Sequence, residues 1–220
     1  MSLRSKAFSF ITLFIAAFMG LFISCSQNTP ELESKDYSVI FDYSDEQTAP
    51  SARLSIFASS SSDVRRYQRI KIVSVETGYC WDTKYLSKLE ADNLQWAGCT
   101  NLVAPEGEKL PVGSYDITYY NADEKDFSIS INVNYDTALY EVLLPSLTEY
   151  MAKKQGIENI AVYDKEHVLI YLGERAELKT TRDIWNNYRD AETYQVIWYT
   201  PNRNVICLTP EKPVSPDVRE

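Results

Sequence analysis

The sequence predicts a mainly β fold, in which strands come first and helices alternate with hairpins later. The clearest strand signal is at 126–135, where every second residue from Phe127 to Val133 is apolar. A period of two places one face of a strand on a core. Tyrosine is abundant (16 residues) and glycine is scarce (7 residues), a composition that favours sheets. Apolar residues take up helical spacing only after Tyr135, so the helices are expected in the last part of the chain.

The first folded part is expected between residues 36 and 136. Alternating segments predict half-buried strands at 37–43, 52–58, 67–76, 114–121 and 126–135. The motif Pro-x-Gly-x-Tyr at 111–115 leads into the strand at 114–121, and the polar turn at 121–125 suits a hairpin loop between this strand and the one at 126–135. This block resembles the closing hairpin of bacterial immunoglobulin-like or fibronectin-III-like sandwiches. The resemblance implies an Ig-like β-sandwich domain over residues 36–136 and indicates no ligand.

A small α+β unit is expected over residues 137–212. Its predicted elements are a helix at 144–156, a hairpin at 158–174, a helix at 178–192 and a hairpin at 194–209, followed by a flexible tail at 213–220. Pro145 near the start of the first helix is typical punctuation. Thr180 or Thr181 is the expected cap of the second helix.

The N-terminus predicts export. Arg4 and Lys6 precede an apolar run at 7–23, whose length lies between that of a signal peptide core and that of a spanning helix. The chain turns polar directly after Cys25, and no basic stop-transfer cluster follows. Leu-Phe-Ile-Ser-Cys at 21–25 resembles a relaxed, spirochaete-like form of the bacterial lipoprotein lipobox. The sequence departs from the family pattern because phenylalanine stands where leucine is usual, three residues before the cysteine.

The lipobox resemblance implies that residues 1–24 form a signal peptide and that Cys25 becomes the lipidated first residue of the mature chain. Several acyl chains there would hold the protein stably on a membrane, and residues 25–35 would form a tether. An ordinary signal peptide followed by a free cysteine, or an uncleaved anchor, remains the alternative. The expected location is the cell envelope. Ser26 after the cysteine implies the outer membrane rather than the inner membrane, by the same resemblance.

The charge of the chain excludes one class of partner. The formal net charge is −9, and loss of Arg4 and Lys6 with a signal peptide would make it −11. Such a field repels the phosphates of nucleic acids, so no nucleic-acid partner is expected. A protein or a glycan is the expected soluble partner.

Cysteines other than Cys25 form an odd set. Cys80 and Cys99 flank a stretch that could fold back as a hairpin, and an exported compartment permits a disulfide between them. Burial as free thiols is the alternative, and pairings with Cys207 are also open. With a single histidine, His167, and no Cys-x-x-Cys motif, neither a metal nor a cofactor is expected.

Catalytic motifs are lacking in the sequence, which predicts no catalytic residue. The favoured function is therefore a non-enzymatic binding or scaffolding module. One alternative is a carbohydrate-binding protein that stacks sugars on exposed aromatic side chains, the candidates being Trp81, Trp96, Trp185 and Trp198. The other is a hydrolase, such as a glycoside hydrolase, that uses a pair of the many carboxylates.

Overall fold

The computed structural model describes residues 32–60, 64–91, 93–122 and 126–215. The predicted signal peptide, the predicted lipidation site at Cys25 and the tether up to residue 31 therefore lie outside the described residues. Within the described part of the chain, no helix is long and apolar enough to cross a membrane.

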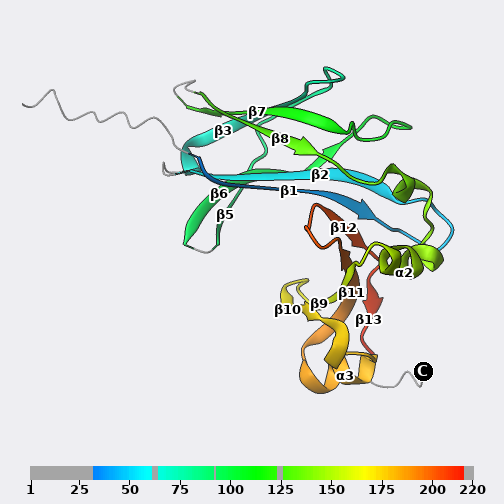
Figure 1. The fold of residues 1–220 in the computed structure, drawn as a ribbon. Helices are drawn as coiled ribbons and strands as arrows, with labels where there is room; N and C mark the ends of the chain where they lie inside the picture. The colour runs from blue at the N-terminus through cyan, green and yellow to red at the C-terminus, as the bar shows by residue number, and fades with distance from the viewer. Residues whose placement is uncertain (1–31, 61–63, 92, 123–125, 216–220) are drawn as a thin grey trace, which may run out of the picture. The chain divides into compact units, whose positions relative to one another are not determined.

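The protein is mainly β, as the sequence predicts (Figure 1). The strands are β1 (Leu32–Asp42), β2 (Ser51–Ser60), β3 (Tyr67–Ser74), β4 (Cys80–Thr83), β5 (Ser87–Ala91), β6 (Leu94–Val103), β7 (Gly113–Asn121), β8 (Asp126–Val133), β9 (Ile157–Asp164), β10 (Leu169–Glu174), β11 (Ala191–Tyr199), β12 (Val205–Leu208) and β13 (Lys212–Pro213). The helices are α2 (Leu144–Lys153) and α3 (Thr181–Asn187), and the 3-10 turns are η2 (Val64–Arg66), η3 (Thr137–Glu141) and η4 (Arg175–Glu177). Residues 32–35, expected in the tether, are the first residues of β1.

Within the described residues, the strands form two sheets. One has nine strands in the order β10-β9-β11-β12-β1-β2-β6-β5, with β13 paired to β11, and the other has the order β4-β3-β7-β8. Strand β1 pairs in parallel with β12, in a ladder from Val39↔Val205 to Asp42↔Leu208. The predicted domain boundary at residue 136 therefore does not separate two sheets, because strands from either side of it share one ladder.

Both sheets contribute side chains to one hydrophobic core. Leu54 on β2, Ile72 on β3 and Ile117 on β7 are fully buried in it. Trp198 on β11 and Cys207 on β12 belong to the same cluster. Burial of such side chains stabilises the fold by roughly 1.5–3 kcal/mol each. Side chains from before and after residue 136 therefore pack together and reinforce the parallel ladder.

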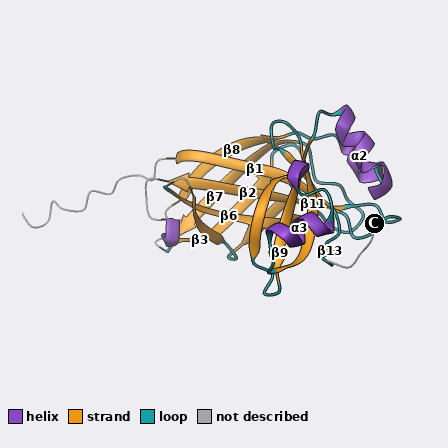
Figure 2. Ribbon diagram, turned by 90° about the horizontal axis from the view of Figure 1, so that it is seen from below, coloured by secondary structure: helices purple, strands orange, loops and turns teal. Residues whose placement is uncertain are grey.

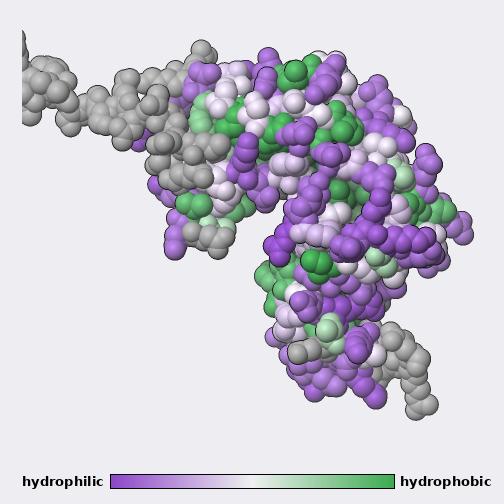
Figure 3. Space-filling model, in the orientation of Figure 1, coloured by the Kyte–Doolittle hydropathy of each residue, from purple (hydrophilic) through white to green (hydrophobic). Residues whose placement is uncertain are grey.

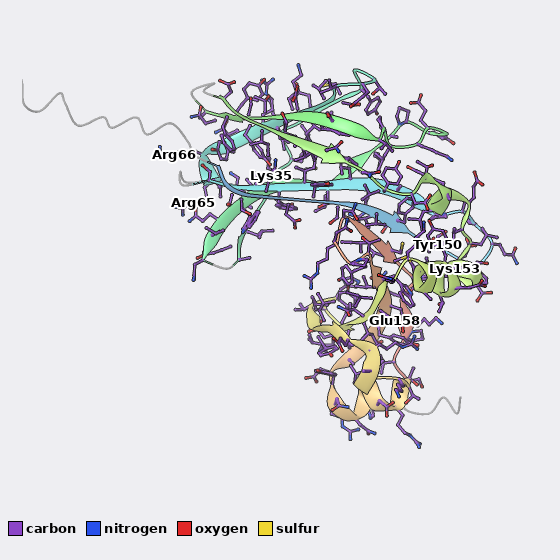
Figure 4. The ribbon with its side chains drawn as sticks, viewed as in Figure 1. Lys35, Arg65, Arg66, Tyr150, Lys153 and Glu158 are labelled. Carbon is purple, nitrogen blue, oxygen red and sulfur yellow. The ribbon has the colours of Figure 1, made fainter. Side chains whose placement is uncertain are left out.

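Side chains from β1 cap the outer edge of β8. Lys35 Nζ donates to the carbonyl oxygen of Ser130 at 2.7 Å, and the Tyr37 hydroxyl donates to that of Asn132 at 2.6 Å. Figure 4 labels Lys35 on its strand. Unpaired carbonyl groups on an edge strand can recruit a foreign strand, so these contacts protect the edge.

Asp136 fastens α2 to the end of β8. Its Oδ2 accepts a hydrogen bond from the Tyr150 hydroxyl at 2.7 Å and lies 2.8 Å from Lys154 Nζ. Tyr150, on α2, is labelled in Figure 4. The hydrogen bond from Lys154, with those from Tyr150 and the Ala138 backbone, lowers the pKa of Asp136 to about 2. The carboxylate is therefore ionised at neutral pH and holds both partners.

A second, smaller core lies between β9, β11 and α3, the elements that Figure 2 labels beside one another. Ile184 on α3 packs there with Ile160 and Val162 of β9. Helix α3 covers only part of the helix expected at 178–192. It ends at Asn187 because asparagine is a weak helix former, and the chain then enters β11 at Ala191 to pair with β9.

Candidate functional site

A hollow beside Trp185 is the best candidate for a functional site. This Trp185 hollow has a volume of about 680 Å³ and lies between the β9–β10 turn and the segment joining α3 to β11. Its charged lining residues are Asp164, Lys165, Glu166, Arg189, Asp190 and Glu192. Pairing of Asp164 with Ala191 on the β9–β11 ladder brings the two sides of the hollow together.

One side of the hollow is positioned by the start of α3. Thr180 and Asp183 form a reciprocal capping box, in which the Asp183 backbone N–H donates to Thr180 Oγ1 at 3.2 Å and the Thr180 backbone N–H donates to Asp183 Oδ2 at 3.0 Å. Ile184 anchors the helix in the smaller core. These contacts fix the helix that carries Trp185.

The other side is positioned by the turn between β9 and β10. Asp164 Oδ1 accepts hydrogen bonds from the backbone N–H of Glu166 at 3.0 Å and of Val168 at 2.8 Å. His167 has a left-handed φ of 59°, which closes the turn. An aspartate that bonds its own following backbone in this way stabilises a tight turn, so the wall formed by residues 164–166 is held in one conformation.

Trp185 is half-buried at the wall of the hollow, where Arg189 lies above its ring. The guanidinium carbon of Arg189 is 5.5 Å from the ring centroid, a distance at which a cation is attracted to an indole face. Movement of this flexible side chain would free the ring for another group. An aromatic ring next to carboxylates can stack on the apolar face of a sugar while the acids accept hydrogen bonds from its hydroxyls.

The charge of the Trp185 hollow selects among ligand classes. Four of its charged lining residues are acidic and two are basic, and Lys165 Nζ lies 3.5 Å from Glu166. The surplus of negative charge disfavours phosphates and other anions. Neutral polyols and cations are the ligands that this lining suits.

The other predicted stacking residues lie elsewhere. Trp198 on β11 is only 7% exposed and belongs to the main core, so it is not available for stacking. Trp81 on β4 packs on Tyr115 and donates its Nε1–H to the Val103 carbonyl oxygen at 2.8 Å. Trp96 on β6 donates its Nε1–H to the Ala91 carbonyl oxygen at 3.3 Å. The four tryptophans therefore form no common platform, and Trp185 alone among them lines this hollow.

No family model matches this chain, and a search of curated proteins finds no significant match to it.

The possible bridge between Cys80 and Cys99, which the sequence left open, is not formed. Both cysteines and Cys207 are free thiols. Cys80 is exposed on β4 and Cys99 lies on β6 of the other sheet, because the intervening residues place β4 and β5 in different sheets instead of folding back as one hairpin. Burial raises the pKa of the Cys207 thiol to about 12, so this thiol is unreactive.

His167 takes part in an exposed cluster that no sequence motif predicts. Its Nε2 lies 2.8 Å from Glu211, and its ring stacks on Tyr163 with centroids 4.6 Å apart. The neighbouring carboxylate raises the pKa of His167, and the histidine lowers that of Glu211. His167 and Glu211 are 44 residues apart, and only folding brings them together. Over the described ranges, no three His, Cys, Asp or Glu side chains gather in a way that could hold a metal ion.

Proposed function

We propose that this protein is a lipid-anchored protein of the bacterial cell envelope, held in the outer membrane, whose folded part is a non-enzymatic binding or scaffolding module. The observation that carries the anchor is the stretch Leu-Phe-Ile-Ser-Cys at 21–25, between an apolar run and a polar one. Acylation of Cys25 gives a stable hold on the membrane. Its partners are the membrane, through the lipid, and a protein or a glycan.

The order of the strands supports an Ig-like β-sandwich for the first part of the fold. In immunoglobulin folds one sheet has the order A-B-E-D and the other contains C-F-G. When the strands are lettered in chain order, the order β1-β2-β6-β5 corresponds to the A-B-E-D sheet. The order β3-β7-β8 corresponds to the C-F-G sheet, and β4 lies beside β3. The residues after the sandwich then form the small α+β unit, which extends the first sheet through β12.

A tyrosine corner supports the same fold. In Ig-like sandwiches, a tyrosine near the start of strand F bonds through its hydroxyl to the backbone a few residues upstream. Tyr115 lies near the start of β7, and its hydroxyl donates to the Pro111 carbonyl oxygen at 2.6 Å. The Pro-x-Gly-x-Tyr motif thus has a physical role in the corner.

The short link between Cys25 and the first strand sets the working distance of the module. A fully extended chain spans at most about 3.3–3.6 Å per residue, so the seven residues from Cys25 to Leu32 reach roughly 25 Å. The start of β1 would therefore stay near the bilayer surface. A module held so close suits a partner in the same membrane or just above it.

Loss of the lipid is the expected result of Cys25→Ala. Cells grown with labelled palmitate should incorporate label into the wild-type chain and into Cys80→Ala, a control that removes an exposed thiol, and none into Cys25→Ala. The variant should also leave the membrane fraction or retain its signal peptide, because processing before the cysteine depends on acylation. Equal labelling of wild type and Cys25→Ala would refute the anchor.

A glycan-binding role is the second candidate, and Trp185 beside the acidic side chains of the Trp185 hollow favours it. We expect Trp185→Ala to raise the dissociation constant for a glycan found by array screening about three- to tenfold, the value of one aromatic contact. Binding is measured by calorimetry, with Tyr85→Ala as the control, because Tyr85 is 89% exposed and does not line this hollow. Equal affinity of the two variants, or no glycan bound by the wild type, would contradict this role.

A further inference from the structure

The hairpin formed by β5 and β6 carries an exposed apolar surface. Every residue of β5 is exposed, and Leu89 among them is 44% exposed. Leu89 lies directly opposite Trp96 of β6, and Ala91 lies opposite Leu94. Directly opposite residues project from the same face of a sheet, so these four side chains form one surface, which we call the hairpin patch. Figure 3 shows hydrophobic side chains, in green, over β5 and β6.

The hairpin patch faces away from the main core. Ala97 is fully buried in that core, and its neighbour Trp96 therefore projects from the opposite face of β6. Phe57 on β2 extends the patch, because its ring lies over Gly98, where a methyl group would be 2.6 Å from the ring. Glu90 is exposed too, but it alternates with Leu89 along β5 and projects from the other face.

The patch lies at the end of the sheet where β1 begins. One row of paired residues crosses four strands, namely Ser34, Ser59, Trp96 and Leu89. Neighbouring strands are about 4.8 Å apart, so the backbones of Ser34 and Leu89 are separated by roughly 14 Å. The link from Cys25 to Leu32 can reach roughly 25 Å, which is more than this separation. Figure 1 shows the β5–β6 hairpin at the same end as the start of β1.

We propose that the hairpin patch docks on the membrane that holds the lipid, with Trp96 at the level of the head groups and Leu89 against the acyl chains. The inference rests on the proposed lipid anchor, which holds this end of the sheet near the bilayer. A few apolar side chains bind a membrane only weakly by themselves, whereas a second signal added to a lipid gives a stable hold. The patch would also fix the orientation of the module on the membrane.

The chemistry of this end of the sheet suits a bilayer interface. The Trp96 Nε1–H donates to the carbonyl oxygen of Ala91 at 3.3 Å, so the indole can leave water without losing its hydrogen bond. Tryptophan is enriched at the head-group level of membranes. Arg65 and Arg66 are exposed on η2, near the start of β1 in Figure 4. Arginine side chains extend their guanidinium groups to the phosphates of such an interface.

The hairpin is fixed to the rest of this end. Lys88 Nζ donates to the carbonyl oxygen of Arg65 at 2.6 Å, which ties β5 to η2. The patch and the two arginines therefore keep their relative positions and can meet one surface together. A membrane suits the patch better than a protein does, because a stable protein interface buries about 1,200–2,000 Å² in total. Four side chains on one hairpin offer much less than that.

Quenching of tryptophan fluorescence by brominated lipids tests the docking. The full-length chain is purified from a bacterial host and reconstituted into vesicles of phosphatidylethanolamine and phosphatidylglycerol, with and without bromine on the acyl chains. We expect bromine to quench the wild-type protein, and Trp96→Phe to lose most of this quenching. Trp185→Phe is the matched control, because Trp185 is also half-buried but lies on α3, and it should keep the quenching.

Flotation of the same vesicles separates the docking from the anchor. If the chain floats with the vesicles but bromine quenches nothing, or quenches wild type and Trp96→Phe equally, the docking is refuted and the anchor stands. If the chain does not float, the anchor is refuted, and the docking that depends on it falls as well.

Hydrogen exchange in the vesicles provides an independent measurement. Leu89→Glu sets a charge in the patch, so amides of β5 and β6 should exchange about fivefold faster than in wild type, the ratio that burial of the exposed part of one leucine gives. Leu89→Met should keep the wild-type rates. Leu172→Glu on β10 is the control, because Leu172 is 50% exposed and lies outside the patch, and it should leave these rates unchanged. Protection that rises with the number of chains per vesicle would indicate contact between copies and overturn the proposal.

Discussion

Gly98→Ala is expected to destabilise the fold by about 3 kcal/mol, within the usual range for a steric conflict in a packed interior. Gly98 is buried on β6, between Phe57 on β2 and Ser87 on β5. A methyl group on its Cα would overlap the Ile56 carbonyl oxygen and lie 2.6 Å from the Phe57 ring. The carbonyl oxygen belongs to the backbone, so the conflict cannot be relieved by turning a side chain. Two central strands would have to move apart.

Gly107→Ala is the matched control for this substitution. Gly107 has a φ of +82°, and nothing lies within 4 Å of the position that a methyl group on its Cα would take. Its replacement should therefore cost only the strain of a left-handed conformation, about 1 kcal/mol. Urea unfolding of both variants measures the difference as a shift of the midpoint at constant slope. A cost for Gly98→Ala no greater than that for Gly107→Ala would show that the two strands do not approach closely.

Period-two patterning makes β1, β2, β3, β7 and β8 predictable from the sequence. The alternation from Phe127 to Val133 lies within β8, and the Pro-x-Gly-x-Tyr motif lies at the entry to β7. Strand β6 is not predicted, because its buried residues do not alternate. Its ladder with β2 shifts register between Leu102 and Cys99, so the strand changes the face that it presents. Strand β5 is exposed along its whole length and has no apolar pattern.

Long-range pairing cannot be predicted in the same way. The parallel ladder joins Val39 to Val205, and no local pattern encodes which two strands will meet. The same limit applies to the candidate site. The sequence identifies Trp185 as a candidate stacking residue from its residue type alone. For Asp164 and Glu166 it indicates only a turn, and no part in a site. These two acids line the Trp185 hollow because β9 pairs with β11, which sets Asp164 opposite Ala191.

Tyr115→Ala is expected to cost about 4 kcal/mol of folding free energy, as is usual for loss of a buried aromatic side chain. Tyr115 is fully buried, and its ring stacks on that of Trp81 with centroids 6.1 Å apart. Its hydroxyl donates to the Pro111 carbonyl oxygen at 2.6 Å. Burial raises the pKa of this hydroxyl, and the charge of Glu76 adds to the effect, so the phenol stays protonated and remains a donor.

Tyr115→Phe separates the hydrogen bond from the packing. The ring remains, so the variant should lose only about 1 kcal/mol, the usual net value of one hydrogen bond. Tyr120→Phe on the same strand is the control. Tyr120 is only half-buried, and its contact with the Arg69 guanidinium is made by the ring, which phenylalanine keeps. It should change the free energy of unfolding by less than about 0.5 kcal/mol.

The ranking of these three variants tests the corner as a structural device. If the hydroxyl fixes the loop before β7, Tyr115→Phe should also speed amide hydrogen exchange at Gly113 and Ser114 more than at Ile117, because the loop frays before the strand does. The Ser114 N–H, at the start of β7, donates to Glu76 at 2.7 Å, so its exchange reports on the end of the strand that follows this loop. Uniform exchange along β7 in Tyr115→Phe would mean that the strand, and not the hydrogen bond to Pro111, holds the corner.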